Sequence, residues 1–346
     1  MLFYILIFSI SVIFVYFAGK SPRSFILHVL ALLGPILVLS LRDLSVGTDT
    51  PNYANLFESS STFNNLIDYL SSTRIEPLFA ILLYTCSHNN IPLAYVYFFS
   101  AILSIVPVYY VAIANRKNAS PALMMFIFYM LFCSYSFNIM RQMIASAFLV
   151  LALYFMVRKA YKKTYFFVLV AFMNHYISVC FLPIVFLAQL MQARSKKTVI
   201  TFSILVLIFL PTIISYFANP LDYYQESYMD KGEVVYQNSY VVEMLLNFLI
   251  LLFAIICNRK IENYSIYMII SLLTLIAIIF SKLAPNIYRV AIMLDMLMLL
   301  YIPQIVQKNR TLKIAYVIFA LFFFWFVFVL NRTCAIIPYR SFSLGI

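Results

Sequence analysis

Charged residues are scarce in this sequence. Only 10% of its 346 residues are charged and 64% are hydrophobic, and the mean hydropathy is +0.96. An average soluble domain is about one quarter charged, so a soluble fold could not hide this much apolar surface. The composition excludes a soluble protein and predicts an integral membrane protein. No stretch has the composition of a soluble domain, and we expect a single membrane domain over residues 1–346.

Glycine, cysteine and carboxylates are also few. Five glycines are fewer than transporters with broken helices and close helix crossings usually have, which is mild evidence against transport. The five cysteines are an odd number and are widely spaced, mostly inside apolar runs. We interpret them as small apolar fillers rather than as metal ligands or disulfide partners. No carboxylate cluster requires a metal, and we predict neither a metal ion nor a cofactor.

The net charge of +12 comes from short basic clusters between apolar runs. Nucleic-acid binding needs a solvent-exposed basic face, and no domain is present to carry one, so we expect no nucleic-acid partner. By the positive-inside rule, the clusters mark cytoplasmic loops. They are Arg116-Lys117, Arg158-Lys159 with Lys162-Lys163, Arg194 with Lys196-Lys197, Arg259-Lys260, and Lys308 with Arg310 and Lys313.

Apolar runs of about 20 residues recur along the whole chain, which is the pattern of bilayer-spanning helices. They predict an all-α polytopic protein with about 10–12 transmembrane segments and with extracytoplasmic loops at 42–75 and 218–239. Basic residues follow the first run without a small-residue cleavage site, so we expect it to be a retained span. The runs are 2–18, 25–41, 76–88, 93–113, 121–135, 139–157, 164–190, 198–217, 240–257, 264–281, 286–304 and 312–330.

Two segments break the alternation between the faces of the membrane. The run 164–190 lies between two basic clusters and is interrupted by Asn174-His175, and each of its arms is too short to span. We predict a re-entrant hairpin with His175 near its tip, lining a cavity open to the outside. Near the start, either 76–88 is re-entrant or the loop 42–75 is cytoplasmic. We favour the first alternative, because it places that loop on the same face as His175.

Arginines gather where this topology places the outer face. Arg42 ends the second span, Arg141 lies one turn inside the sixth between Asn138 and Gln142, and Arg289 lies one turn inside the eleventh. Charges within spans favour a functional interpretation, and several guanidinium groups at one cavity suit a diphosphate. Arg42 could equally snorkel at a helix end, and Arg289 could form a structural pair with another helix.

Oxygen-bearing side chains follow a glycine in the loop that begins at Arg42. Gly47 permits a tight turn, and Thr48, Asp49 and Thr50 come directly after it. Such a cluster suits a hydroxyl-rich ligand or the orientation of an arginine. The same pattern is equally typical of the N-cap of a following helix.

A glutamate and a histidine complete the candidate set. Glu76 precedes Pro77, and an acid next to a proline is ordinary chemistry at the start of a helix. A lone histidine is usually structural, but His175 lies at the break of the re-entrant run, where a functional role is equally favoured.

Taken together, these residues resemble the EpsG family. The resemblance rests on an ordered set spread over about residues 40–300, and no single motif in it is specific. Tyr176 departs from the family, whose members tend to have a small residue after the histidine. The set comprises Arg42, Val46-Gly47-Thr48-Asp49-Thr50, Tyr53, Phe57, Glu76-Pro77-Leu78-Phe79, Asn138, Arg141-Gln142, Ala145, Asn174-His175 and Arg289.

The EpsG family is similar in role to the Wzy O-antigen and capsular polysaccharide polymerases. The resemblance implies a multi-pass glycosyltransferase of the bacterial inner membrane, which joins undecaprenyl-diphosphate-linked oligosaccharide repeat units on the extracytoplasmic face. A chain-length regulator is a candidate partner beside the lipid bilayer. Either His175 or Asp49 would serve as the base. The residues implied to bind the diphosphate or the sugars are Arg42, Arg141, Arg289, Thr48, Tyr53, Glu76, Asn138 and Gln142.

Other membrane functions remain open from the sequence. A lipid-linked oligosaccharide flippase should have two related halves and charges that reach both faces, and the sequence shows neither. An O-antigen ligase or an acyltransferase would also place His and Arg near a membrane face. A ligase typically has a large outer loop late in the chain, whereas the late loop here is short.

Overall fold

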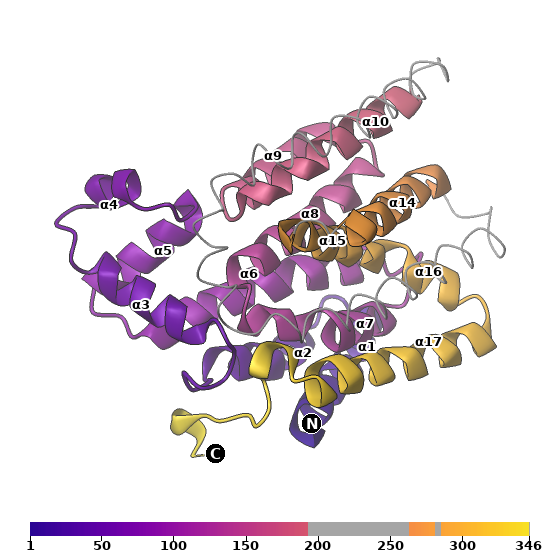
Figure 1. The fold of residues 1–346 in the computed structure, drawn as a ribbon. Coiled ribbons are helices and arrows are strands. Elements are labelled where there is room, and N and C mark those ends of the chain that lie inside the picture. The colour runs from indigo at the N-terminus through magenta and orange to yellow at the C-terminus, as the bar shows by residue number, and fades with distance from the viewer. Residues whose placement is uncertain (193–262, 281–284, 346) are drawn as a thin grey trace.

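The computed structural model describes residues 1–192, 263–280 and 285–345, and this part of the chain contains helices and no strand (Figure 1). An all-α polytopic membrane fold is thereby confirmed. The predicted spans 198–217 and 240–257 and the predicted loop 218–239 lie outside the described residues. So do two basic clusters, Arg194 with Lys196-Lys197 and Arg259-Lys260.

The helices follow the predicted apolar runs, with boundaries that differ by a few residues. Short 3₁₀ or π-helical turns continue several of them and are labelled η. In chain order they are α1 (Leu2–Lys20), α2 (Phe25–Ser40), α3 (Thr50–Ser60), α4 (Leu66–Ser72), α5 (Pro77–His88), α6 (Leu93–Ala114), α7 (Pro121–Leu131), η1 (Cys133–Phe137), α8 (Met140–Met156), α9 (Tyr161–Phe172), η2 (Tyr176–Phe181), α10 (Leu182–Gln192), α14 (Tyr264–Phe280), α15 (Pro285–Met296), η4 (Leu297–Leu300), α16 (Ile302–Val306), α17 (Arg310–Phe323), η5 (Phe324–Leu330), η6 (Thr333–Ala335) and η7 (Phe342–Leu344).

Helix α8 forms the centre of the bundle. It packs against α6, α9 and α15, and most of its residues are buried on every side. A helix that is apolar all round is expected in such a position, because no face of it needs to meet water. The sequence of α8 after Gln142 contains no charged residue until Arg158, and this allows complete burial.

Outer helices expose apolar faces. Leu6, Ile13 and Phe17 of α1 and Phe25 and Ile26 of α2 are exposed. In the described part, α1, α6 and residues 310–330 are long and apolar enough to cross a bilayer, and several shorter apolar helices accompany them. Exposed apolar faces of this kind are stable in lipid rather than in water, in agreement with the predicted membrane protein.

One end of the bundle gathers the described basic clusters. Gly19, next to Lys20, lies against Pro121 at the start of α7. The Arg158 guanidinium donates a hydrogen bond to Asn115 Oδ1 over 2.9 Å, and Gln307 Nε2 donates to the Asn118 carbonyl over 2.6 Å. We call this the basic end. Its composition fits the cytoplasmic face that the positive-inside rule predicts.

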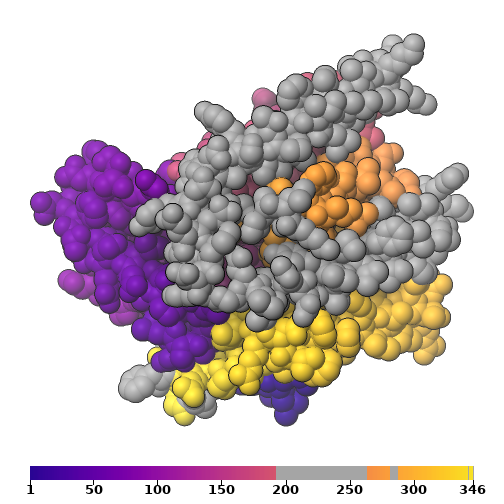
Figure 2. Space-filling model, viewed as in Figure 1, coloured from indigo at the N-terminus to yellow at the C-terminus, as the bar shows by residue number. Residues whose placement is uncertain are grey.

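At the opposite end of the bundle, the first and last segments of the chain contact each other and the segment after α2. The Tyr4 hydroxyl donates to the Ile336 carbonyl over 2.7 Å, and the backbone amide of Asp43 donates to the Arg340 carbonyl over 2.9 Å. The segment 42–75, predicted as a loop, contains two helices, α3 and α4. Together with α5 they form a lobe at the left end of the molecule, in indigo to purple (Figures 1 and 2).

Helix α5 does not cross the bundle. Its 12 residues extend about 18 Å, well short of a hydrocarbon layer about 30 Å thick. Residues near its end contact the preceding lobe: Ser60 Oγ donates to Ser87 Oγ over 2.8 Å, and His88 Nε2 lies 2.7 Å from the Phe63 carbonyl. The start of the helix contacts the turn after α9, because the Leu78 amide donates to the Met173 carbonyl over 3.0 Å, so neither end of α5 reaches the basic end. This geometry agrees with the favoured alternative, in which 76–88 is re-entrant, while the side of the membrane on which 42–75 lies stays a prediction.

The run 164–190 folds as the predicted interrupted segment. Helix α9 ends at Phe172, the chain turns through Asn174 and His175, and η2 leads into α10. The turn is fixed by backbone hydrogen bonds, because the amides of Asn174 and His175 both donate to the Ala171 carbonyl. His175 consequently lies at the tip of the turn, away from the basic end.

Candidate functional site

The start of α8, with Asn138 just before it, contacts three separate parts of the chain. Helix α7 ends at Leu131, η1 carries the chain to Asn138, and α8 starts at Met140. Asn138 then contacts Thr48, Met140 contacts Arg42, Arg141 pairs with Glu76, and Gln142 Nε2 donates to the Arg289 carbonyl over 2.8 Å. The arginines and polar residues predicted on the outer face are therefore brought to one end of the bundle.

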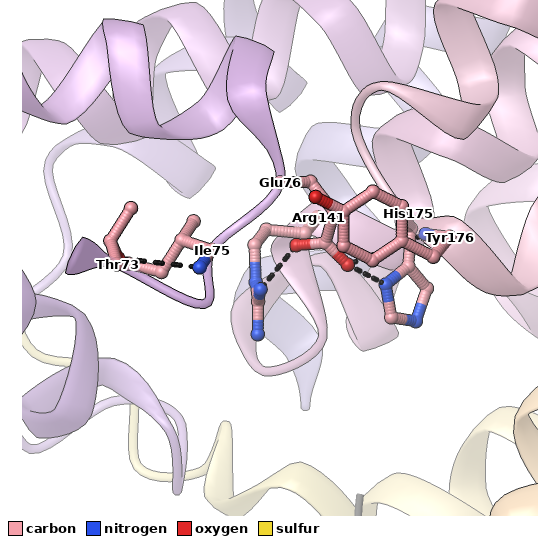
Figure 3. Close-up of polar contacts among 6 residues, drawn as sticks. All are labelled: Thr73, Ile75, Glu76, Arg141, His175 and Tyr176. Carbon is pink, nitrogen blue, oxygen red and sulfur yellow. Dashed lines mark hydrogen bonds and ion pairs between the residues drawn. The ribbon is translucent and has the colours of Figure 1, made fainter. Parts of the chain in front are cut away.

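Glu76 is the centre of the closest cluster (Figure 3). One of its carboxylate oxygens lies 2.6 Å from Nδ1 of His175, and the other forms an ion pair with Nη1 of Arg141. The side chains of Glu76 and His175 are 4% and 7% exposed, and that of Arg141 is 15% exposed. The amide of Leu78 donates to the Met173 carbonyl over 3.0 Å, which fixes the start of α5 against the turn after α9.

The charges in this cluster follow from its surroundings. Glu76 and His175 lie in connecting segments, outside the spanning helices. Burial alone would raise the pKa of Glu76, but the His175 hydrogen bond and the Arg141 charge lower it to about 2. Burial lowers the pKa of His175, and attraction to Glu76 offsets only part of that effect. At neutral pH the cluster holds an ionised Glu76, a charged Arg141 and a neutral His175.

The hydrogen bond to Glu76 also fixes the tautomer of His175. An ionised carboxylate only accepts hydrogen bonds, so Nδ1 carries the proton and donates it to Glu76. The lone pair is then on Nε2, which is buried and has no hydrogen-bond partner among the described residues. A neutral histidine oriented by a carboxylate, with its other nitrogen unoccupied, can accept a proton from a bound hydroxyl group.

Arg289 is the second cation near His175. It lies on α15, which packs against η2, and its positive charge contributes to lowering the pKa of His175. Its side chain is partly exposed, and no side-chain hydrogen bond or ion pair holds it in the described part of the chain. Within the described residues, one paired cationic group and one without an ion pair therefore lie beside the histidine.

The turn at Gly47 is fastened to η1 and α8. Gly47 has a φ of 97°, which only glycine adopts readily, and its amide donates to the Ala335 carbonyl over 3.2 Å. The Thr48 amide donates to Asn138 Oδ1 over 3.0 Å, and Asn138 Nδ2 donates to Thr48 Oγ1 over 2.6 Å. Both polar atoms of the Asn138 side chain therefore bond to Thr48 and hold the turn in place.

Asp49 and Tyr53 follow this turn. Asp49 occupies the N-cap position of α3, as one of the two interpretations predicts, but its side chain makes no capping hydrogen bond. Tyr53 is 6% exposed and packs edge-on against Phe79, with ring centroids 5.6 Å apart. It forms part of the apolar core of the α3–α5 lobe.

Arg42 is enclosed rather than snorkelling. It is 6% exposed and lies over the ring of Tyr97, with its guanidinium carbon 4.3 Å from the ring centroid. Nη2 lies 3.2 Å from the Met140 sulfur, and Nη1 makes a long hydrogen bond of 3.4 Å to the Ser136 carbonyl. Burial lowers the pKa of Arg42 to about 10, so that it stays protonated at neutral pH.

Sequence reasoning missed the partners of these residues. Tyr97 and Met140 lie in apolar helices without any local signal, and their contacts with Arg42 arise only from tertiary packing. Glu76 and Arg141 are 65 positions apart, so no helical spacing indicates that they pair. Asp295, which the sequence leaves unassigned, is buried beside Tyr135 in a separate cavity.

The prediction that the protein binds no metal ion can be compared only with the residues that the structure describes. No group of three or more His, Cys, Asp or Glu side chains there has the arrangement of a metal site. Three of the four described cysteines, Cys86, Cys133 and Cys334, are buried, consistent with their interpretation as fillers.

Comparison with known proteins supports the resemblance stated from the sequence. The EpsG family model matches residues 25–341. Because this match covers nearly the whole chain, the protein belongs to the EpsG family. Searches of curated proteins and of solved structures found no match.

Proposed function

We propose that this EpsG-family protein is a membrane glycosyltransferase that joins polyprenyl-diphosphate-linked oligosaccharide repeat units, as O-antigen and capsule polymerases do. The observation that carries the proposal is the Glu76–His175 pair, with Arg141 and Arg289 beside it, at the end of the bundle opposite the basic loops. By the positive-inside rule, that end faces away from the cytoplasm of a bacterial inner membrane.

His175 acts as the general base in this proposal. The hydroxyl oxygen of the acceptor sugar attacks the anomeric carbon of the donor, and its proton moves to Nε2 of His175. The bond between the anomeric carbon and the diphosphate oxygen breaks, and the diphosphate leaves with the electron pair. Glu76 keeps the proton of His175 on Nδ1 and stabilises the imidazolium that forms.

The cations stabilise the leaving group. Negative charge develops on the departing diphosphate, and preorganised guanidinium groups stabilise it without further reorganisation. We assign the direct contact to Arg289, which is partly exposed, and a supporting charge to Arg141, which Glu76 holds in place. Arg42 is enclosed by Tyr97 and Met140, and this geometry does not favour its predicted direct contact with the diphosphate.

The remaining residues that were predicted to contact the substrate have different roles in this proposal. Gln142 is bonded to the Arg289 backbone and Asn138 to Thr48, so we propose that they position the arginine and the Gly47 turn. Tyr53 lies in the core of the α3–α5 lobe, where it supports the start of α5 through Phe79. Asp49 remains the alternative base, because it is partly exposed in the segment next to the site.

The variant His175→Ala tests the proposal in cells. We expect export and attachment of single repeat units to continue while longer chains disappear, because loss of a general base slows the reaction by roughly 10²- to 10⁴-fold. Product length on a gel, with protein level in the membrane, gives the readout. The matched control is His88→Ala, which removes an exposed histidine from the same end of the molecule.

Each other outcome identifies a different function. Loss of the single-unit product in a stably inserted variant would indicate a flippase and contradict the proposal. Unchanged ladders would remove His175 from the mechanism and shift the base to Asp49. Single units that are made but not attached would indicate an O-antigen ligase or another membrane transferase.

A further inference from the structure

The surroundings of Arg42 contain buried polar atoms without partners. Nε of Arg42 and the hydroxyl oxygens of Ser100 and Ser136 are inaccessible to solvent and make no hydrogen bond in the described structure. All three residues are more than nine-tenths buried: Arg42 is 6% exposed, Ser100 3% and Ser136 4%. Leaving one buried donor unsatisfied costs about 1–3 kcal/mol, and more when the group is charged.

The same three residues line one gap. Tyr97, Ser104 and Met140 complete most of its wall, and the space between the side chains is too narrow for a water-sized sphere, so that an ion enters only if a side chain moves. The three unpartnered groups come from separate elements: Arg42 follows α2, Ser100 lies on α6 and Ser136 on η1. Their meeting at one place is therefore a product of the fold rather than of local sequence.

The buried charge of Arg42 has no counter-charge in the gap. None of the residues that line it is an aspartate or a glutamate. The adjacent Asp43 accepts a hydrogen bond from the Ser45 amide over 2.9 Å at the surface. In the part of the chain that the structure describes, the titratable groups that face Arg42 are four tyrosines, Tyr4, Tyr53, Tyr97 and Tyr339. A buried cation without a counter-charge is costly even when a ring and a carbonyl contact it, and an exogenous anion would lower that cost.

We propose that a single-atom anion, chloride under cellular conditions, binds between Arg42, Ser100 and Ser136. The guanidinium Nε–H and the two hydroxyl groups would donate to it, and a buried charged group would gain a counter-ion. Met140 closes the gap, and its flexible thioether would shift to admit the ion. A diphosphate with its lipid is far larger than this gap.

Such an anion would support the start of α8. Arg42 contacts the Ser136 carbonyl and Met140, which lie on either side of Asn138, and Met140 directly precedes Arg141. A neutralised and fully bonded Arg42 would hold these residues in place and so position the ion pair with Glu76. The anion site does not rest on the reaction proposed above. Chloride binding can be measured without any sugar substrate.

Equilibrium binding of radioactive chloride to the purified full-length protein in detergent tests the proposal. We expect one saturable site per chain, displaced by bromide and much less by inorganic phosphate. Arg42→Gln should abolish binding, and Ser100→Ala, which keeps the arginine, should weaken it about tenfold, since a hydrogen bond to a charged group is lost. Arg74→Gln, at an exposed arginine of the same end, is the matched control and should bind as the wild type.

Three results would overturn the proposal. Absence of saturable chloride binding to the wild type would show that water or nothing fills the gap. Binding that survives both Arg42→Gln and Ser100→Ala would place the ion elsewhere. If inorganic phosphate displaced chloride more strongly than bromide does, the site would be a phosphate-binding site rather than a chloride site. If Arg42→Gln fails to fold, as judged by size-exclusion chromatography, Ser100→Ala alone decides.

Discussion

Glu76 joins a cation and a histidine through the two oxygens of one carboxylate. Its pairing with Arg141 keeps it ionised in a nearly solvent-free position, and its contact with Nδ1 orients the ring of His175. A carboxylate in this place is thus both a counter-charge and a positioning group. The two roles predict different consequences when it is replaced by its neutral isostere.

Replacing Glu76 with glutamine should destabilise the protein and slow chain elongation. The change leaves the Arg141 charge unpaired, and breaking a buried ion pair by removing one partner costs about 3–5 kcal/mol. It also weakens the control of the His175 tautomer, so we expect elongation to be slower by about tenfold or more. Chemical denaturation in mixed micelles and product length measure the two effects. Glu58→Gln, at an exposed position of α3, is the control.

The stability difference should also depend on pH. Because the pKa of Glu76 is lowered from 4.5 to about 2, its stabilising contribution is complete above pH 4.5 and is lost as the pH falls toward 2. The gap in unfolding free energy between wild type and Glu76→Gln should shrink across that interval. A gap that stayed constant from neutral pH down to pH 2 would contradict the ionised pair.

At the scale of elements, the turn at Gly47 connects the segment after α2 to α8. A Cβ atom at Gly47 would lie 2.7 Å from the Phe137 carbonyl oxygen and 2.6 Å from Thr50 Oγ1. The backbone there has a positive φ, which adds strain for any other residue. The turn therefore tolerates no side chain without moving η1, which leads into the first turn of α8.

Gly47→Ala should consequently destabilise the protein and reduce activity together. We expect a loss of at least about 1–3 kcal/mol, since a strained backbone and a close contact with a main-chain atom are combined. Gly345→Ala is a matched control, because Gly345 also has a positive φ but meets nothing within 4 Å. Equal effects of both variants on unfolding would show that strain alone, rather than contact with Phe137, makes Gly47 necessary.

Hydropathy predicted the spanning helices and the interrupted run around His175, because bilayer thickness fixes the length of an apolar helix. It did not predict α3 and α4, which are short and mixed in polarity and whose formation depends on packing against α5. His175 was accessible to sequence reasoning because it breaks an apolar run.

The partners of the candidate residues could not be predicted in the same way. Glu76 has an ordinary helix-start explanation, and its contacts with Arg141 and His175 exist only in the folded chain. The enclosure of Arg42 by Tyr97 likewise depends on how α6 approaches α2. Local sequence identified unusual residues, whereas their grouping required the tertiary structure.

For the whole molecule, the two ends of the bundle should face opposite sides of the membrane. A cysteine introduced at exposed Thr48 should react with an impermeant thiol reagent added outside intact spheroplasts, whereas one at exposed Lys162 should not. Labelling of the wild type gives the background from native cysteines. Labelling at 162 with protection at 48 would invert the orientation and place the His175 site on the cytoplasmic face.

The most direct test of the proposed polymerase is reconstitution of the purified protein in liposomes. The substrate is the lipid-linked repeat unit extracted from cells that lack this gene, and mass spectrometry follows the products. The account predicts lipid-linked chains of two and more units, with one polyprenyl diphosphate released for each bond formed, and predicts neither product with His175→Ala. Single units that cross the bilayer without ever being joined by the wild-type protein would contradict it.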